Sequence, residues 1–175
     1  CVQALIEAKA DLNAASNIGN TALHYACGDG HTPCVQALIK ADADLNAAQH
    51  QGITPLYIAC QNGHEPCVQA LIEAKANLNA VQHQGATPLH IACIKGRTSC
   101  VQALIDAKLQ KNMVLDLNAV NNNGYTPLHL ACQEGHAPCV QAFIEAKAKM
   151  DLDLNLAQNQ GVTPLYLACQ NGHTD

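Results

Sequence analysis

Residues 54–85 read TPLYIACQNGHEPCVQALIEAKANLNAVQHQG, and this stretch holds the local signals that decide the fold. Thr54 can cap a helix with its hydroxyl group, and Pro55 fits the first helical turn, where its missing N–H has no bond to lose. Further on, Gly63 can adopt the left-handed conformation that ends a helix. The segment therefore predicts a short first helix between Thr54 and Gly63.

A second helix is predicted directly after the first. Pro66 again suits a first turn, and the apolar residues Val68, Leu71 and Ile72 recur at helical spacing. The polar residues 82–85 that follow end in glycine and are typical of a β-turn. The stretch as a whole predicts a helix, a turn, a second helix and a protruding finger.

The same signals recur along the whole chain. The first residue of Cys-Val-Gln-Ala stands at Cys1, Cys34, Cys67, Cys100 and Cys139, in steps of 33, 33, 33 and 39 residues. The threonine of Thr-(Ala/Pro)-Leu-(His/Tyr) stands at Thr21, Thr54, Thr87, Thr126 and Thr163, in steps of 33, 33, 39 and 37 residues. A fixed period in this range predicts a solenoid of supersecondary units, none of which buries its apolar face alone.

The recurring pattern is Asn-Ala, then a variable segment with a Gly, then Thr-Pro-Leu-His, Ala-Cys and Gly-His. This pattern resembles the ankyrin repeat, and the resemblance covers essentially the whole chain. The resemblance implies an all-α solenoid of stacked helix-turn-helix units with β-turn fingers. We expect four complete units, at about 17–49, 50–82, 83–121 and 122–158, and partial units at 1–16 and 159–175. Because neither end shows a polar capping repeat, we expect an internal piece of a longer array.

Two departures from the family pattern stand out. Where the family usually ends the second helix with Gly, this chain has Lys9, Asp42, Lys75, Lys108 and Lys147. A non-Gly residue in the left-handed region costs about 1 kcal/mol. Where the family often begins the finger with Asp, this chain has Ser16, Gln49, Gln82, Asn121 and Gln158. The hydrogen bond of that Asp is then lost or remade by an amide.

Two insertions break the rhythm after a second helix, at about residues 109–114 and 149–152. We expect partial helix extension in the longer insertion and a loop in the shorter one. Leu109 and Met113 are four residues apart, which places them on one helical face. Met113 could then be an exposed anchor for a secondary contact, while the plainer alternative is drift in a surface loop.

Composition excludes several function classes. The net charge is −5 and the nine Lys and Arg are scattered singly, whereas nucleic-acid binding needs a basic stripe. No apolar run approaches the roughly 20 residues of a membrane span. No phosphate loop, nucleophile elbow or isolated carboxylate pair is present. We therefore expect no enzyme activity, no cofactor, no membrane insertion and a soluble, cytoplasmic setting.

Cysteine and histidine offer the main alternative. A Cys-x3-His-x2-Cys pattern occurs at Cys27, His31 and Cys34 and is repeated at Cys60, His64 and Cys67 and at Cys132, His136 and Cys139. Thiolate and imidazole are zinc ligands. Arg97 replaces the histidine in one copy, and no fourth ligand is evident, so we favour reduced, mostly buried cysteines that pack as small hydrophobes. A thiol-based metal or redox protein stays the alternative, and a metal site is not predicted.

His24, His90 and His129 lie in Thr-(Ala/Pro)-Leu-His, where the family resemblance implies that imidazole ties neighbouring fingers together. Tyr57 and Tyr166 stand at the same position in two units. A general base would not be repeated and then exchanged for tyrosine, so these histidines are predicted to be structural.

The resemblance implies that fingers and first helices line a concave face that binds a protein or peptide partner. Non-consensus positions there are the candidate partner-binding residues His50, Gln51, Ile53, Gln61, Asn62, His83, Gln84, Ile94, Lys95, Asn122, Asn123, Tyr125, Gln133 and Glu134. This set is rich in amides, which suits hydrogen bonding to protein, and Tyr125, Ile94 and Ile53 are the expected anchors. We expect a monomeric interaction scaffold within a longer chain; a mere spacer or the regulatory array of a larger enzyme are alternatives.

Overall fold

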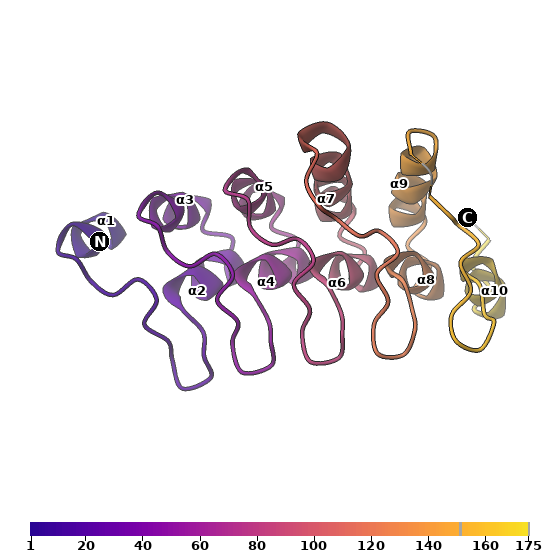
Figure 1. Ribbon diagram of the computed structural model, residues 1–175, viewed down its shortest axis with the longest axis horizontal. Coiled ribbons are helices and arrows are strands. Elements are labelled where there is room, and N and C mark those ends of the chain that lie inside the picture. The colour runs from indigo at the N-terminus through magenta and orange to yellow at the C-terminus, as the bar shows by residue number, and fades with distance from the viewer. Residues whose placement is uncertain (151, 175) are drawn as a thin grey trace.

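The computed structural model describes residues 1–150 and 152–174, and these residues form helices without any strand. The helices are α1 (Val2–Glu7), α2 (Ala22–Gly28), α3 (Thr32–Lys40), α4 (Pro55–Asn62), α5 (Glu65–Glu73), α6 (Pro88–Ile94), α7 (Thr98–Lys111), α8 (Pro127–Gln133), α9 (Ala137–Lys147) and α10 (Pro164–Gln170). Figure 1 shows the odd-numbered helices in one row, the even-numbered helices in a second row, and loops projecting beyond the second row. The predicted helical solenoid is confirmed.

Helix α4 begins and ends at the residues that the sequence indicates. The Thr54 hydroxyl accepts a hydrogen bond from the Tyr57 backbone N–H at 3.3 Å, and Pro55 occupies the first turn. Gly63 adopts the left-handed conformation with φ 81° and ends α4. These local choices fix where α4 starts and stops, and they therefore set the direction in which each loop leaves the stack.

Small residues fill the space between the two rows of helices. Ala59, Ala92 and Ala131 are completely buried on the even-numbered helices. Phe143 on α9 is also fully buried, and it is the one Phe of the chain. Because alanine and cysteine bring helix axes close together, the core needs few aromatic rings. None of the helices in residues 1–150 and 152–174 has the length and apolar character that crossing a bilayer requires.

The ends of the odd-numbered helices bear out part of the prediction about non-Gly residues. Left-handed backbone with φ of 58°, 61° and 63° occurs at Lys9, Asp42 and Lys75. The same expectation is wrong for Lys108 and Lys147, which lie inside α7 and α9. In the first of these, Asn112 takes the left-handed conformation instead, with φ 50°. Inserted residues prolong the helix, so the strained position moves to its new end.

The longer insertion extends a helix, as predicted. Helix α7 has 14 residues, whereas α5 has 9. Met113 follows the left-handed Asn112, so the prediction that it shares a helical face with Leu109 is wrong. Met113 is also not an exposed anchor, because it and Leu109 are half-buried and pack against the core. Val114 is the exposed apolar residue of this insertion, at 85%.

The shorter insertion forms a loop over its described residues. Helix α9 ends at Lys147, and a turn follows at 148–150. Met150 is half-buried against the core, and Leu152 returns to it with 4% exposure. The predicted loop is thus seen at both sides of Asp151, which itself lies outside the described residues.

Asparagine side chains tie the loops that follow successive odd-numbered helices. Each Asn accepts a hydrogen bond at 2.8–2.9 Å from a backbone N–H of the next unit. The pairs are Asn13 with Asp44, Asn46 with Asn77, and Asn79 with Asp116. This ladder holds the base of each projecting loop at a fixed distance from its neighbour.

Candidate functional site

The projecting loops are closed β-turn fingers. In the second finger, Gln49 N–H donates to Ile53 O at 3.0 Å, and Gly52 N–H donates to Gln49 O at 2.8 Å. Gly52 has φ 78°, a left-handed value at which a residue with a Cβ is strained. The same two backbone bonds recur in the fingers that begin at Gln82, Asn121 and Gln158. Each finger is therefore a small, internally bonded unit.

Backbone hydrogen bonds also join one finger to the next. His50 N–H donates to Ile18 O at 3.2 Å, His83 N–H to Gln51 O at 3.0 Å, and Asn122 N–H to Gln84 O at 3.0 Å. Figure 1 shows the fingers lying side by side along the stack as a result. The fingertip side chains are thus displayed from a supported surface.

The amides that replace the family's aspartate remake its hydrogen bond. Gln49 Oε1 accepts from Gln51 N–H at 2.6 Å, and Gln82 Oε1 accepts from Gln84 N–H at the same distance. Asn121 Oδ1 accepts from two backbone N–H groups, those of Asn123 and Tyr125, each at 3.0 Å. Of the two outcomes left open by the sequence, replacement by an amide is the one observed.

Buried histidines connect α2, α6 and α8 to the finger that follows each of them, as predicted. Nε2 of His24 donates to Ile53 O, and Nε2 of His90 donates to Tyr125 O, both at 3.0 Å. His129 makes the same bond to Val162 O. Because these three imidazoles are nearly or fully buried, each serves as an internal strut and not as a reactive group.

The tautomer of these histidines follows from the donors around them. Thr87 N–H donates to Nδ1 of His90 at 3.1 Å, so Nδ1 is an acceptor and the proton resides on Nε2. His24 is arranged in the same way against Thr21. Burial lowers the pKa of His24, His90 and His129 below the usual value, while the bonds to backbone carbonyls oppose that shift.

A second ladder of side-chain hydrogen bonds, which was not predicted from the sequence, also joins neighbouring units. Nε2 of His64 donates to Gly28 O at 2.9 Å, and His136 donates to Ile94 O at 3.1 Å. Arg97 replaces the histidine without losing the link, because its Nε donates to Gln61 O at 3.2 Å. The sequence did carry a signal for these hydrogen bonds, because Gly-His recurs at the start of successive odd-numbered helices. Arginine, which is also an N–H donor, replaces the histidine once.

The hydrogen bonds of this second ladder direct the histidine of the Cys-x3-His-x2-Cys pattern away from its two cysteines. His64 points its Nε2 at a backbone carbonyl of the preceding unit, whereas Cys60 and Cys67 are fully buried in the core. Among residues 1–150 and 152–174, no group of three or more His, Cys, Asp or Glu side chains is arranged to hold a metal ion.

The state of the thiols points to packing. All ten cysteines are unpaired, and seven of them are buried, so the prediction of mostly buried cysteines is confirmed. Burial raises the pKa of Cys100 and Cys132 to about 11, and raises the pKa of Cys60 and Cys93 well above the usual value. At neutral pH these groups are thiols, whereas thiolate is the nucleophile and the metal ligand.

The candidate partner-binding residues fall into two groups. The finger group combines exposed tips with two half-buried side chains, and it consists of His50, Gln51, Ile53, His83, Gln84, Asn122, Asn123 and Tyr125. The helix-end group lies where even-numbered helices finish, half-buried or exposed, and it consists of Gln61, Asn62, Ile94, Lys95, Gln133 and Glu134. An even-numbered helix of seven or eight residues, about 12 Å long, separates the groups.

Some of these side chains already have partners within the array. Asn62 Nδ2 donates to Gly28 O at 2.8 Å, and Asn122 Nδ2 donates to His83 O at 3.1 Å. Ile53 and Ile94 pack against the core from its edge. Asn62 and Asn122 therefore help to join units, and the exposed tips His50, Gln51, His83 and Gln84 remain the freer part of the set.

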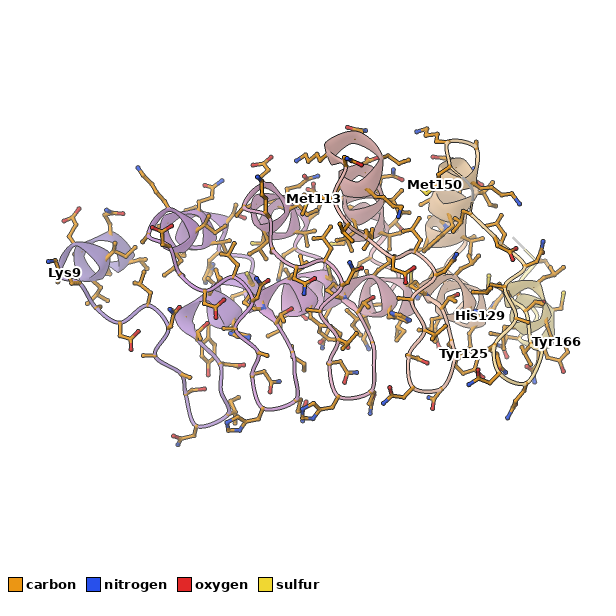
Figure 2. All side chains as sticks on the ribbon, in the orientation of Figure 1. Lys9, Met113, Tyr125, His129, Met150 and Tyr166 are labelled. Atoms are coloured by element: carbon orange, nitrogen blue, oxygen red, sulfur yellow. The ribbon has the colours of Figure 1, made fainter. Side chains whose placement is uncertain are left out.

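Tyr125 lies in a cleft between the fourth and fifth fingers. The cleft has a volume of about 460 Å³ and is lined by Asn123, Tyr125, Gln158, Asn159 and Gln160. Edge-on packing against the His129 ring, with centroids 5.9 Å apart, holds the Tyr125 ring (Figure 2). Gln158 was assigned from sequence only to the internal bond of its finger, because its position beside Tyr125 depends on the stacking of two fingers.

A comparison with known families gives one result for the whole chain. The model described as "Ankyrin repeats (3 copies)" matches residues 1–49, 41–114 and 109–175. No significant match was found among curated proteins.

Proposed function

Because the chain belongs to the ankyrin-repeat family, whose arrays generally mediate protein–protein interactions, we propose that it binds a protein or peptide partner through its fingers and even-numbered helices. In this proposal the array is a scaffold without catalytic activity of its own. Its four complete units, at 17–49, 50–82, 83–121 and 122–158, together supply the concave binding face.

The observation that supports the proposal most directly is the fixed display of fingertip side chains. The backbones of His50 and His83 are bonded to the preceding finger, and the buried His90 holds the base of the next one. The side chains of Gln51 and Gln84 remain exposed between these supports. A preordered surface loses little conformational entropy on binding, so modest contacts suffice for useful affinity.

Tyr125 is the proposed central anchor. Its ring is half-buried and is held by His129, while the cleft beside it is lined by the amide side chains of Asn123, Gln158, Asn159 and Gln160. A half-buried aromatic ring surrounded by hydrogen-bonding groups is typical of positions that dominate binding energy. We propose that an extended peptide segment of the partner inserts an apolar side chain here, with its backbone bonded to the amides.

The charge of the surface favours an uncharged recognition segment. Lys95 and Glu134 are the only Lys, Arg, Asp or Glu among the candidate residues, and they have opposite charges. The net charge of −5 also disfavours a nucleic-acid backbone. We therefore propose a partner that is recognised by hydrogen bonds and apolar contacts rather than by charge.

Ten unpaired thiols support a cytoplasmic, reducing setting for this scaffold. The intact mass of native protein, measured without reductant after rapid alkylation, would then show ten modified cysteines on denaturation. Several disulfide-linked pairs would contradict this part of the proposal.

The proposal is tested with a matched pair of double variants. Tyr125→Ala with His83→Ala changes the proposed face, and Gln36→Ala with Gln141→Ala changes exposed residues on the odd-numbered helices α3 and α9. Each protein is used as bait for quantitative capture, and the affinity for each captured protein is then measured with purified components. Thermal melting of all three baits verifies that the variants are folded.

We expect wild type and the control variant to bind with the same affinity. The face variant should bind at least about tenfold more weakly, since truncating an aromatic anchor removes 1.4 kcal/mol or more. A partner that tolerates the face variant and is lost with the Gln36 and Gln141 variant would contradict the proposal.

A further inference from the structure

The fourth finger differs from the others in the residue that precedes its fingertip glycine. That residue is Asn123, followed by Gly124. The other four fingers have Ile18, Gln51, Gln84 and Gln160 at this position. Asparagine is a chemically labile residue, because its side-chain amide lies within reach of the next backbone nitrogen. A following glycine hinders that approach least, since it has no Cβ.

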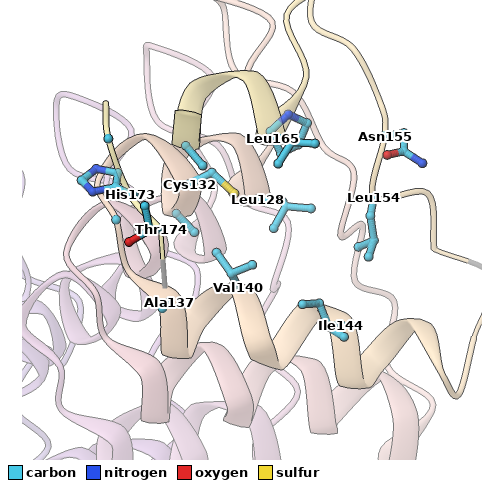
Figure 3. Close-up of a pocket in the computed structure, with 15 residues that line it drawn as sticks. Leu128, Cys132, Ala137, Val140, Ile144, Leu154, Asn155, Leu165, His173 and Thr174 are labelled. Carbon is cyan, nitrogen blue, oxygen red and sulfur yellow. The ribbon is translucent and has the colours of Figure 1, made fainter. Parts of the chain in front are cut away.

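Two further Asn-Gly pairs of the chain are held by hydrogen bonds. Asn62 is the last residue of α4, and its Nδ2 donates to Gly28 O at 2.8 Å. Asn171 follows α10, and its Nδ2 donates to Gln133 O at 2.9 Å. Gly172, the next residue, lines the groove that Figure 3 shows beside α8, α9 and α10. In both pairs the side-chain amide is thus bonded to the preceding unit, and the backbone belongs to the end of a helix.

The side chain of Asn123 has no such support. It is exposed at the fingertip, and its amide makes no hydrogen bond to any residue in 1–150 and 152–174. It lines the cleft of about 460 Å³ beside Tyr125. One backbone bond holds the nitrogen that follows it, because Gly124 N–H donates to Asn121 O at 2.8 Å. Only this turn bond has to open before the Gly124 nitrogen can reach the Asn123 side chain.

We propose that Asn123 is a site of spontaneous deamidation, through which the fingertip beside Tyr125 acquires a negative charge. The Gly124 nitrogen attacks Cγ of Asn123 and gives up its proton. The new N–Cγ bond closes a succinimide ring, and the Cγ–Nδ2 bond breaks with release of ammonia. Water then opens the ring at either carbonyl, which gives an aspartyl or an isoaspartyl residue. Water is the only co-reactant, so no enzyme, cofactor or oxidant is required.

The glutamines of the other fingers do not share this reactivity. The side chain of Gln51 or Gln84 is longer by one methylene group, so the same attack would have to close a larger and less favourable ring. The sequence of the repeat therefore places the labile residue in the fourth finger alone among equivalent fingertips. It is also the finger that carries Tyr125.

The aspartyl product changes the chemistry of an uncharged surface. The fingers, at 16–20, 49–53, 82–86, 121–125 and 158–162, contain no Lys, Arg, Asp or Glu. A carboxylate at residue 123 introduces a negative charge there, and it replaces the N–H donors of the amide with an acceptor. The effect on partner binding rests on the proposed function, whereas the deamidation itself does not.

The isoaspartyl product also lengthens the backbone of the finger by one carbon atom. The bond from Gly124 N–H to Asn121 O then no longer closes the turn at its present spacing. The finger has little room to adjust, because a Cβ on Gly124 would lie 2.9 Å from the side chain of Asn159 in the next finger. We therefore expect the backbone of residues 121–125 to become more open to solvent.

The experiment follows the three Asn-Gly pairs in one sample. The purified array is incubated in native buffer, and a second sample is incubated in guanidinium chloride, which unfolds it. Peptide mapping by mass spectrometry measures deamidation at each pair over time. Asn123→Gln gives the fourth finger the residue of Gln84, and the matched control Asn122→His gives it the residue of His83 while leaving the reacting pair intact. Circular dichroism verifies that both variants are folded.

We expect the three pairs to deamidate at comparable rates in denaturant, because each is an asparagine followed by glycine. In the folded array Asn123 should react at least about tenfold faster than Asn62 or Asn171, which must first lose a side-chain hydrogen bond and part of a helical turn. Asn123→Gln should abolish the reaction at this fingertip, and Asn122→His should retain it. Hydrogen exchange at 121–125 should become faster in aged wild type and stay unchanged in aged Asn123→Gln.

Two results would overturn the assignment of the site. Equal rates at Asn62 and Asn123 in the folded array would show that the hydrogen bonds do not select the reacting pair. An Asn123 that reacts in denaturant but stays intact in the folded array would show that the finger protects it.

The effect on binding is read separately, with Asn123→Asp and the protein captured by the wild-type array. Loss of the amide donors should weaken its affinity at least about threefold. Equal affinities of Asn123→Asp and wild type would overturn the effect on binding and leave the site of deamidation in place. A failure of the proposed function itself is recognised independently, from the variant that combines Tyr125→Ala with His83→Ala.

Discussion

Helices α5 and α7 occupy equivalent places in neighbouring units, but they end differently. Helix α5 stops at Glu73, and Lys75 adopts the left-handed backbone with φ 63°. Helix α7 continues through Lys108, which matches Lys75 in sequence, and the left-handed residue is Asn112. The difference shows that the left-handed conformation occurs where the helix ends and not at one fixed position of the repeat.

The even-numbered helices of the same two units differ in their link to the next finger. In α6, His90 accepts from Thr87 N–H and donates to Tyr125 O. In α4, the buried Tyr57 stands in its place. The two neighbouring units therefore serve as controls for each other in two features. One is the side-chain link from an even-numbered helix to the next finger (the finger link), and the other is the end of the odd-numbered helix.

The largest effect is expected at the finger link. His90→Ala removes both ring nitrogens and leaves a buried N–H and a buried carbonyl without partners, so we expect a loss of about 2 kcal/mol or more in the free energy of unfolding. Tyr57→Phe keeps its ring and should lose less than about 1 kcal/mol. Urea unfolding measures both. Equal losses would show that the histidine is only filling space.

The same link predicts a dependence on pH. Burial lowers the folded-state pKa of His24, His90 and His129 below the usual 6.5, so the neutral form is the one that favours folding. This contribution is complete above about pH 6.5 and is lost as the pH falls from there through the lowered pKa values. We expect the urea concentration at the unfolding midpoint to decrease as the pH is lowered from about 7 to about 5.

His90→Tyr supplies the control for the pH experiment, because it gives α6 the residue that α4 already has. The variant should lose less stability over the same pH range than wild type. A wild-type midpoint that does not change with pH, or a variant that changes as much as wild type, would contradict the role assigned to the neutral imidazole.

The helix ends predict opposite effects for the same substitution. Lys75→Gly relieves the strain of a side chain at φ 63° and should stabilise the chain by about 1 kcal/mol. Lys108→Gly weakens the interior of α7 and should destabilise it by about 1 kcal/mol. Thermal unfolding of the two variants is the measurement. Melting temperatures that change in the same direction in both variants would contradict the conclusion that the left-handed position of α7 has moved to Asn112.

The smallest effect is expected at Asn112 itself. Asparagine tolerates left-handed backbone better than lysine does, so Asn112→Gly should gain only about 0.3 kcal/mol, clearly less than Lys75→Gly. Chemical unfolding of the two single variants and their double variant checks the order. A gain at residue 112 that exceeds the gain at residue 75 would reverse this ranking.

The helices and fingers could be predicted because their signals are local. Thr54, Pro55 and Gly63 act within one turn of the backbone that they shape, and the period of the two sequence ladders then supplies the stack. The link from His24 to Ile53 O was also foreseen, since the family resemblance assigns that role to its position.

Other features were hidden because they depend on contacts between units. The acceptor of His64 is a backbone carbonyl 36 residues away, which no side-chain pattern encodes. Lys108 suits either a helix interior or a helix end, so the sequence alone did not decide where α7 stops. The cleft beside Tyr125 combines two fingers and exists only after they stack. The fourteen partner-binding residues stay predictions.

Hydrogen–deuterium exchange of the array with a captured partner tests the central claim most directly. The account predicts that the partner slows exchange in the fingers, at 49–53, 82–86 and 121–125, and at the ends of α4, α6 and α8, while α3, α5 and α9 exchange as in the free array. Slowed exchange confined to the odd-numbered helices would contradict the proposed binding face.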